Sequence, residues 1–305
     1  MIIHNPQPER SRLGDFVNEL KIELKLRKEA RRGFPRLLDY AERRLGYRPD
    51  FKNPRTFNEK VMWRKIFDRN PLFPVISDKL RLRDEVRKRL GTHADDVLCD
   101  LLATTRDPDR FDFSKLPKAY VAKANHASGW NIIVPPGSEV DISVMRHEMK
   151  KWLRRSYGKD KMEWAYQPIP RRVVFEEYMS QPGGKAPDDL KVMFFDGHCE
   201  FVLRVDDRFG EATQNFMKPD WTPYGFRTVD HRTHALPEKP HLFNEMIKVG
   251  EVMAKGLDSI RVDFLFTEDR FVLNEMTLYR GSGMTPFNPP EWDRHFGDLW
   301  TLPTR

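Results

Sequence analysis

Two hairpin-like stretches in the second half of the chain limit its fold most strongly. Residues 190–206, LKVMFFDGHCEFVLRVD, place two apolar runs around Asp-Gly, and residues 261–277, RVDFLFTEDRFVLNEMT, place two around TEDR. Apolar runs joined by tight turns are typical of antiparallel strands. Helical periodicity occurs at residues 11–32, 56–70, 77–90, 141–157 and 241–256, and Thr56 and Glu59 form a T-x-x-E capping box at the start of the second of these. The mixture predicts an α+β fold with a helical N-terminal region.

The hairpin at 261–277 carries the first candidate site. A loop over residues 267–271 gives the cross-strand pairs Arg261–Thr277, Asp263–Glu275 and Leu265–Leu273. Because alternate residues of a strand share a face, the polar pairs would lie on one surface. Opposed carboxylates repel unless a cation lies between them, and Mg²⁺ uses such oxygen ligands together with substrate phosphates. A solvent-facing strand with ordinary charges is the alternative.

Two further motifs have the residue types of a nucleotide site. Lys123 precedes the loop His126-Ala-Ser-Gly-Trp130, in which an ammonium group and loop amides suit phosphate. The loop lacks the GxxxxGK[ST] pattern, and most glycine turns between strands are only turns. In VVFEEYM, residues 173–179, Glu176 and Glu177 must point to opposite faces of a strand. One of them is then buried beside either a ligand, such as a purine amino group or a ribose hydroxyl, or the nearby Arg171 or Arg172.

Charge is concentrated in the first part of the chain. The net charge is +7, yet residues 1–90 hold 24 lysines and arginines against 13 aspartates and glutamates. This asymmetry indicates an anionic partner such as nucleic acid, acidic lipid or a charged polymer, with solvated basic helices as the alternative. The stripe Leu13, Phe16, Leu20 and Leu24 makes residues 11–32 an amphipathic helix, for which core packing is the commoner role.

The remaining composition predicts a cytoplasmic protein. Two cysteines, Cys99 and Cys199, are too few for a disulfide framework. There is no apolar run long enough to span a membrane, and the opening MIIHNPQPER lacks the apolar stretch of a signal peptide.

Taken in order, the motifs resemble the TupA-like ATP-grasp family from about residue 40 to the end. The matching stretches are LGYRPDFKNPRTFNEKVMWRKIFDRNP, SDKLRLRDEV, AYVAKANHASGW, VVFEEYM, DLKVMFFDG, VDDR, RVDFLF, LNEMT and GSGMTPFNPPEWD. The resemblance implies two α+β subdomains that grip ATP. We expect a basic amphipathic helix at 1–40, a helical region at 41–117, a small subdomain with phosphate loop and hinge at 118–180, and a C-terminal subdomain with metal and acceptor sites at 181–305.

The resemblance also implies a role for each candidate residue. ATP would be held by Lys79 and Lys123 at its phosphates, by His126, Ser128 and Gly129 in the closing loop, and by Glu176, Glu177, Tyr178 and Met179 at adenine and ribose. Two Mg²⁺ ions would be held by Asp263 and Glu275, with Thr277 where an amide ligand is usual. Arg261 would neutralise the transferring phosphoryl group and Lys191 would lie near it, while Gly281, Ser282, Gly283 and Arg208 would border the acceptor.

The activity implied by the resemblance is ATP-dependent ligation of a carboxylate to an amine through an acyl phosphate. The family is linked to cell-surface polysaccharide, so we expect an amino acid or peptide to be joined to a uronic-acid-like group of a cell-envelope precursor. Three alternatives remain: a kinase acting on a glycan hydroxyl, a metal-dependent glycosyltransferase using Asp206 and Asp207, and a non-enzymatic nucleic-acid or membrane binder. We expect no nucleic acid as partner. For the basic helix at residues 11–32, two uses stay open: contact with an anionic membrane and binding of an acidic polysaccharide.

Overall fold

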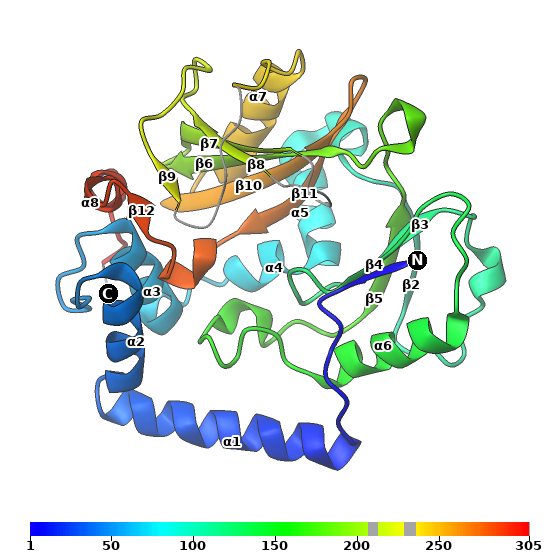
Figure 1. Ribbon diagram of the computed structural model, residues 1–305, viewed down its shortest axis with the longest axis horizontal. Helices are drawn as coiled ribbons and strands as arrows, with labels where there is room; N and C mark the ends of the chain where they lie inside the picture. The colour runs from blue at the N-terminus through cyan, green and yellow to red at the C-terminus, as the bar shows by residue number, and fades with distance from the viewer. Residues whose placement is uncertain (207–212, 229–235, 305) are drawn as a thin grey trace. The chain divides into compact units, whose positions relative to one another are not determined.

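The chain forms two compact units, each assembled from three segments of sequence. The computed structural model describes residues 1–206, 213–228 and 236–304 (Figure 1). The first unit comprises residues 1–32, 71–84 and 99–184, and the second comprises 33–70, 85–98 and 185–305. The helical region expected at 41–117 therefore contributes to both units. Within the described residues, no helix is long and apolar enough to cross a membrane.

The first unit is built on a five-stranded antiparallel sheet in the order β1-β4-β3-β5-β2. Its elements are β1 (Ile2–His4), α1 (Arg12–Arg31), α4 (Phe73–Ser77), β2 (Leu101–Thr105), β3 (Tyr120–Ala124), β4 (Asn131–Val134), α6 (Ile142–Arg154) and β5 (Val173–Glu177). Helix α6 covers the sheet (Figure 1), and its fully buried Met149 and Trp152 share a core with Ala122, Ile132 and Phe175 of the strands. The alternation of apolar residues in β3 and β4 thus buries one face of this sheet.

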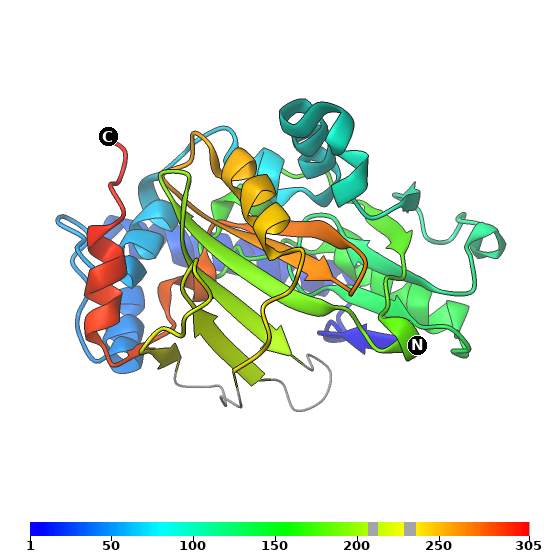
Figure 2. The same cartoon turned by 90° about the horizontal axis from the view of Figure 1, so that it is seen from above.

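The second unit contains another five-stranded antiparallel sheet, in the order β11-β10-β6-β7-β8. Its elements are α2 (Pro35–Leu45), α3 (Phe57–Phe67), β6 (Asp188–Phe195), β7 (His198–Asp206), β8 (Thr213–Met217), β9 (Arg227–Thr228), α7 (Phe243–Ala254), β10 (Ser259–Phe266), β11 (Phe271–Thr277), β12 (Phe287–Asn288) and α8 (Glu291–Asp298). Helix α7 lies along the sheet (Figure 2). A Cβ atom at Gly250 would approach Cζ of Phe194 to 2.3 Å, so glycine allows this close packing.

Helix α5 (Lys79–Leu90) belongs to both units, since the boundary between them in sequence falls after residue 84. The other predicted helices are also present, with ends that differ from the expected ones by a few residues. The β6–β7 hairpin turns at Asp196 and Gly197, whose φ angles of 48° and 83° are those a two-residue turn of this kind requires.

Helix α3 is a buried element of the second unit. It begins with the predicted capping box, in which Glu59 N donates to Thr56 Oγ1 (3.2 Å) and Thr56 N donates to Glu59 Oε2 (2.9 Å). Its Arg64 is 1% exposed and donates to Asp258 Oδ1 (2.6 Å) and to the Ser259 carbonyl (2.7 Å). These bonds attach α3 to the start of β10, the strand that carries the first candidate site.

Candidate functional site

The β10–β11 hairpin places the predicted polar residues opposite one another. Asp263 pairs with Glu275, and Arg261 pairs with Thr277, as the sequence predicted. The two carboxylates therefore meet on one face of the sheet, and the guanidinium group and the hydroxyl lie beside them.

The hairpin reaches this register by a different path from the one predicted. The turn spans residues 267–270, one residue shorter than expected, so Leu265 pairs with Val272 and the predicted pairing with Leu273 is wrong. A β-bulge between Asp263 and Phe264 then leaves one extra residue on β11, which restores the predicted register at the carboxylates.

Strand β6 adds two more charged residues to this face. Lys191 pairs with Asp263 across the β6–β10 ladder, and Asp189 lies two residues earlier on the same strand. We call Asp189, Lys191, Arg261, Asp263, Glu275 and Thr277 the charge cluster. Its contacts are Arg261 Nε–Asp263 Oδ1 (2.6 Å), Arg261 Nη2–Asp263 Oδ2 (2.6 Å), Arg261 Nη2–Thr277 Oγ1 (3.0 Å), Lys191 Nζ–Asp189 Oδ1 (3.0 Å), Lys191 Nζ–Asp263 Oδ2 (3.6 Å) and Arg261 Nη2–Glu275 Oε1 (3.9 Å).

Because the side chains of this cluster are largely removed from solvent, the pKa of each charged group depends on the charges of its neighbours. The Asp263 side chain is fully buried, and burial raises its pKa, while Arg261 and Lys191 oppose the rise. Burial alone would lower the pKa of Arg261, but the negative charges of Asp263, Glu275 and Asp189, together with the hydrogen bonds to Asp263, outweigh burial and raise it. Glu275 retains partial access to solvent. The buried Asp263 carboxylate therefore needs a neighbouring cation with or without a ligand present. The Glu275 carboxylate is accessible to a ligand that arrives from solvent.

The opposed carboxylates suit a hard divalent cation. Asp263, Glu275 and the Thr277 hydroxyl offer oxygen donors on one face, which is the chemistry Mg²⁺ prefers. Among the described residues, no three or more His, Cys, Asp or Glu side chains gather as metal ligands. The donor set fits an ion that takes its other ligands from phosphate oxygens and water, as Mg²⁺ does in nucleotide sites.

Arg280, which the sequence reasoning missed, is buried close to this cluster. It is 6% exposed and lies over the rings of Phe287 (4.9 Å), Phe216 (5.9 Å) and Phe57 (6.0 Å). Among the described residues, none accepts a hydrogen bond from its Nη1 atom. Burial, reinforced by the positive charge of Arg261, lowers the pKa of Arg280 to about 9. A buried guanidinium group with an open donor is suited to an anionic ligand.

The loop after Arg280 is held in a conformation that requires small residues. Gly281, Ser282 and Gly283 all have positive φ, and a Cβ atom at Gly283 would meet the Asn58 carbonyl at 2.8 Å. Lys65 of α3 donates to the Ser282 carbonyl (2.7 Å) and Oγ (2.9 Å). Three of the four residues predicted to border the acceptor therefore form one rigid loop. The fourth, Arg208, lies outside the described residues, as does Asp207.

The first unit brings together one predicted lysine and one predicted glutamate. Lys123 Nζ on β3 lies 2.6 Å from Glu176 Oε2 on β5, and both side chains are about nine-tenths buried. Arg83 of α5 reaches Glu176 Oε1 at 3.7 Å. Glu176 thus has an arginine partner, but this partner is Arg83 and not the predicted Arg171 or Arg172, and Glu176 also neutralises Lys123.

Lys79 extends toward the predicted phosphate loop. It is the first residue of α5, and its Nζ donates to the Ala127 carbonyl (2.6 Å). The buried Asn125 fixes this arrangement, because its Nδ2 donates to Asp78 Oδ1 (2.9 Å) and its Oδ1 accepts from Arg172 N (2.7 Å). Asp78 in turn accepts from Leu80 N (2.9 Å) and caps α5.

The other residues predicted for the nucleotide differ in environment. His126 is 1% exposed, and burial lowers its pKa to about 4, with ring nitrogens near Asn125 Oδ1 (3.3 Å) and the Arg155 carbonyl (3.2 Å). Gly129 has a φ of 75° and its carbonyl accepts from Asn5 Nδ2 (3.2 Å), while its neighbour Ser128 is partly exposed. After β5, Glu177 accepts from Asp100 N (3.0 Å), Tyr178 is half-buried and Met179 is buried.

Some of the missed residues had a signal in the sequence. Asp189 lies two positions from Lys191 in an apolar strand, so it shares that residue's face. Arg280 directly precedes the predicted acceptor loop. Arg83 lies one helical turn after Lys79, on the same side of α5. Nothing in the sequence marks Asn125 as the residue that links the loop to Asp78, because that contact exists only in the folded unit.

Comparison with known proteins finds one matching family model and several similar structures. Residues 59–301 match the family model TupA-like ATPgrasp. Among solved structures, a D-alanine–D-alanine ligase from Bacillus anthracis complexed with ATP is 15% identical, with a TM-score of 0.39 over 67% of this chain and 55% of that one. An N5-carboxyaminoimidazole ribonucleotide synthetase from Thermus thermophilus is 9% identical, with a TM-score of 0.39 over 67% and 45%. The chain thus matches about half the length of these structures. A search of curated proteins finds no match.

Proposed function

This chain belongs to the TupA-like ATP-grasp family, with its α+β fold, and we propose that it is a Mg·ATP-dependent carboxylate–amine ligase. The observation that carries the proposal is the charge cluster, in which opposed carboxylates share one sheet face with two cations. Phosphoryl transfer needs positioning and charge neutralisation rather than a side-chain nucleophile, and this face supplies both.

The first unit supports the assignment of ATP phosphates to Lys79 and Lys123. Each ammonium group now contacts an oxygen of the protein, the Ala127 carbonyl for Lys79 and the Glu176 carboxylate for Lys123. An ATP phosphate would compete for the same ammonium protons with a higher charge. Glu176 would keep Arg83 as its partner when Lys123 turns to phosphate. Glu177, Tyr178 and Met179 follow β5 directly, and we assign adenine and ribose to them.

The proposed chemistry has two balanced steps. A substrate carboxylate oxygen attacks the γ-phosphorus of ATP, which forms an acyl phosphate and releases ADP. An amine nitrogen then attacks the acyl carbon, phosphate leaves, and the amine loses a proton to give the amide. Mg²⁺ held by Asp263, Glu275 and Thr277 would neutralise the triphosphate. Arg261 and Lys191 would stabilise the charge on the transferring group.

Arg280 gives the acceptor site a defined chemistry. Its buried guanidinium group, next to the rigid 281–283 loop, would bind the substrate carboxylate by charge-assisted hydrogen bonds. A uronic-acid-like carboxylate on a surface-glycan precursor meets this requirement, with an amino acid or peptide as the amine. Because ATP and such precursors meet in the cytoplasm, we assign the reaction to that compartment, as part of cell-envelope polysaccharide biosynthesis.

Hydroxylamine trapping tests the ligase against the kinase alternative. The enzyme is incubated with Mg·ATP, an acceptor found by ADP release, and hydroxylamine in place of the amine. A ligase yields a hydroxamate, because hydroxylamine captures the acyl phosphate. A stable phosphorylated acceptor with no hydroxamate would overturn the ligase proposal in favour of the kinase.

Two variants test the glycosyltransferase alternative. If Lys123 binds ATP phosphates, Lys123→Met should lose ADP release, whereas Asp207→Asn should retain it. The opposite pattern, with activity lost only in Asp207→Asn, would favour a glycosyltransferase. Thermal protection by Mg·ATP in the wild type but not in Lys123→Met gives an independent measure of nucleotide binding.

A further inference from the structure

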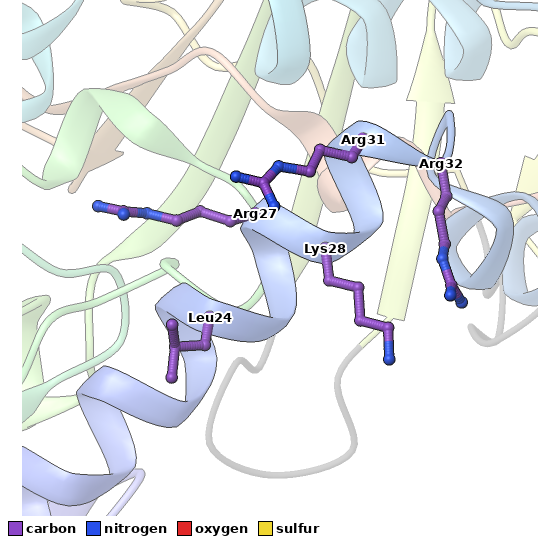
Figure 3. A pocket seen from close by; sticks show the side chains of 5 residues that line it. All are labelled: Leu24, Arg27, Lys28, Arg31 and Arg32. Carbon is purple, nitrogen blue, oxygen red and sulfur yellow. The ribbon is translucent and has the colours of Figure 1, made fainter.

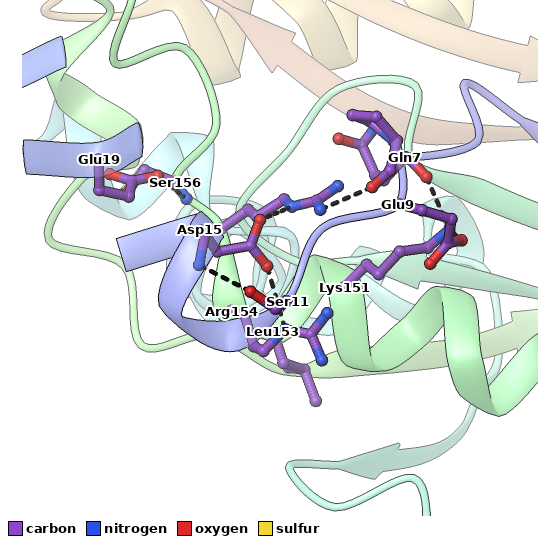
Figure 4. Close-up of polar contacts among 12 residues, drawn as sticks. Gln7, Glu9, Ser11, Asp15, Glu19, Lys151, Leu153, Arg154 and Ser156 are labelled. Atoms are coloured by element: carbon purple, nitrogen blue, oxygen red, sulfur yellow. Dashed lines mark hydrogen bonds and ion pairs between the residues drawn. The ribbon is translucent and has the colours of Figure 1, made fainter. Parts of the chain in front are cut away.

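Helix α1 is packed in the opposite sense to an ordinary amphipathic helix. Its acidic side faces the first unit (Figure 4), where Asp15 accepts from Arg155 Nε (2.7 Å) and Arg154 Nε (3.2 Å). One turn later Glu19 accepts from Ser156 N (2.9 Å). Farther along, Glu23 lies 3.4 Å from Lys159 Nζ. Polar contacts therefore attach this helix to its unit, and the apolar stripe does not.

The apolar stripe of α1 faces away from the unit. The exposed fractions are 72% for Leu13, 66% for Phe16, 38% for Val17, 47% for Leu20 and 57% for Leu24. Core packing, the commoner role of such a stripe, does not occur here. Single exposed apolar residues are ordinary, but five on one face of a helix, over three turns, mark an interaction surface.

The same face becomes strongly basic toward the end of the helix. A surface pocket of about 490 Å³ is lined by Leu24 and by four cations, Arg27, Lys28, Arg31 and Arg32 (Figure 3). Lys21 and Lys25 are also exposed. Of the acidic residues in α1, Asp15 and Glu29 are buried, while Glu19 and Glu23 contact Lys159. Glu23, whose side chain is 41% exposed, also accepts from Arg27 Nη2 (2.5 Å), so the excess of positive charge on the outward face of α1 rests on Lys28, Arg31 and Arg32 together with Lys21 and Lys25.

We propose that α1 docks flat on a lipid bilayer surface that carries anionic headgroups. The helix is about 30 Å long, and its apolar residues would enter the boundary between headgroups and acyl chains. The cations of its last turns would contact lipid phosphates, which attract basic residues near an anionic leaflet. This contact would keep the enzyme at the surface where lipid-linked precursors reside.

The charge of the face argues against the other occupants. A second copy docked through the same face would bring the two sets of cations together if the helices were parallel, and would place them on the partner's apolar residues if the helices were antiparallel; both arrangements are unfavourable. Nucleic acid would match the cations but would leave Leu13, Phe16 and Leu20 without an apolar partner. A bilayer with anionic lipids offers an apolar environment to the leucines and Phe16 of this face and phosphate groups to its cations.

Vesicle sedimentation of the full chain tests this proposal without reference to catalysis. The probes are vesicles of phosphatidylcholine alone and of phosphatidylcholine with about 30 mol% phosphatidylglycerol. We expect binding to the anionic vesicles that weakens as salt rises, and at least about 10-fold weaker binding to phosphatidylcholine. Replacing Phe16 and Leu20 by Ser should reduce binding to anionic vesicles by about 10-fold or more.

Two further variants separate the contribution of the cations of α1 from that of its apolar residues and from nonspecific effects. Lys28→Glu with Arg31→Glu should abolish the preference for phosphatidylglycerol. Val144→Ser on α6, also exposed and in the same unit, is the matched control and should bind as the wild type does. Equal vesicle binding by the Phe16/Leu20 variant and the wild type would overturn the proposal. So would a concentration-dependent dimer in sedimentation velocity that the same variant abolishes, because a second copy would then be the occupant.

Discussion

Replacing Arg280 by Met should stabilise the protein while it damages acceptor binding. The fold lowers the pKa of this guanidinium group from its ordinary value to about 9. A difference of that size corresponds to roughly 5 kcal/mol against the charged form. The three ring contacts, worth about 0.5–2 kcal/mol each, are lost in the variant and offset part of the gain. Met keeps the length and packing of the side chain, so we expect a net gain of up to about 3 kcal/mol.

Thermal unfolding and acceptor kinetics measure the two sides of this prediction. The melting temperature of the Arg280→Met variant should rise by up to about 5 °C. Its kcat/KM for the acceptor should fall at least about 10-fold, because a charge-assisted hydrogen bond is lost. The KM for ATP should be unchanged.

Arg64→Met is the matched control. Arg64 is also buried, but it is paired with Asp258 and with the Ser259 carbonyl. Removing it leaves a carboxylate without its partner, so this variant should lose about 3–5 kcal/mol. If Arg280→Met is destabilised to the same degree, Arg280 is a structural residue. If it is stabilised with unchanged acceptor kinetics, the assignment to the acceptor site is wrong.

Two other predictions concern the carboxylates and the buried histidine. Glu275→Gln should lower turnover at least about 100-fold with an unchanged unfolding midpoint, and normal turnover of this variant would refute the metal assignment. Asp263→Ala should also lose about 3–5 kcal/mol of stability, because the largely buried Arg261 loses the carboxylate that holds it at two atoms. Burial holds the pKa of His126 at about 4 against 6.5 when unfolded, so its neutral form contributes stability above pH 6.5 that is lost as pH falls toward 4. In urea unfolding, the free energy of unfolding of the wild type should fall by up to about 3 kcal/mol over that pH range, and that of His126→Gln should not show this fall. Parallel curves of free energy against pH for the two proteins would contradict the prediction.

The sequence alone predicted the features of the fold that follow from local periodicity. Alternation within strands predicted the opposed Asp263 and Glu275, and the capping box at Thr56 predicted where α3 begins. The predicted partner of Leu265 was wrong, because the turn is shorter than expected and a β-bulge compensates for the difference. The alternation of residues within the strands reveals neither feature. Register at a site is therefore more predictable than the turn beside it, since burial of one face penalises every slip by one residue.

Orientation and pairing of side chains were decided only by the tertiary structure. The periodicity of α1 predicted an apolar stripe, but the carboxylates of Asp15 and Glu19 meet Arg155 and the Ser156 amide, and these contacts turn the stripe outward. In the same way, residue type alone does not distinguish the paired Arg64 from Arg280, whose Nη1 has no acceptor among the described residues. Sequence patterns determine which face a residue occupies, because chain geometry is local. The partner of a buried charge is chosen by segments distant in sequence, and only their packing determines whether that charge serves the fold or a ligand.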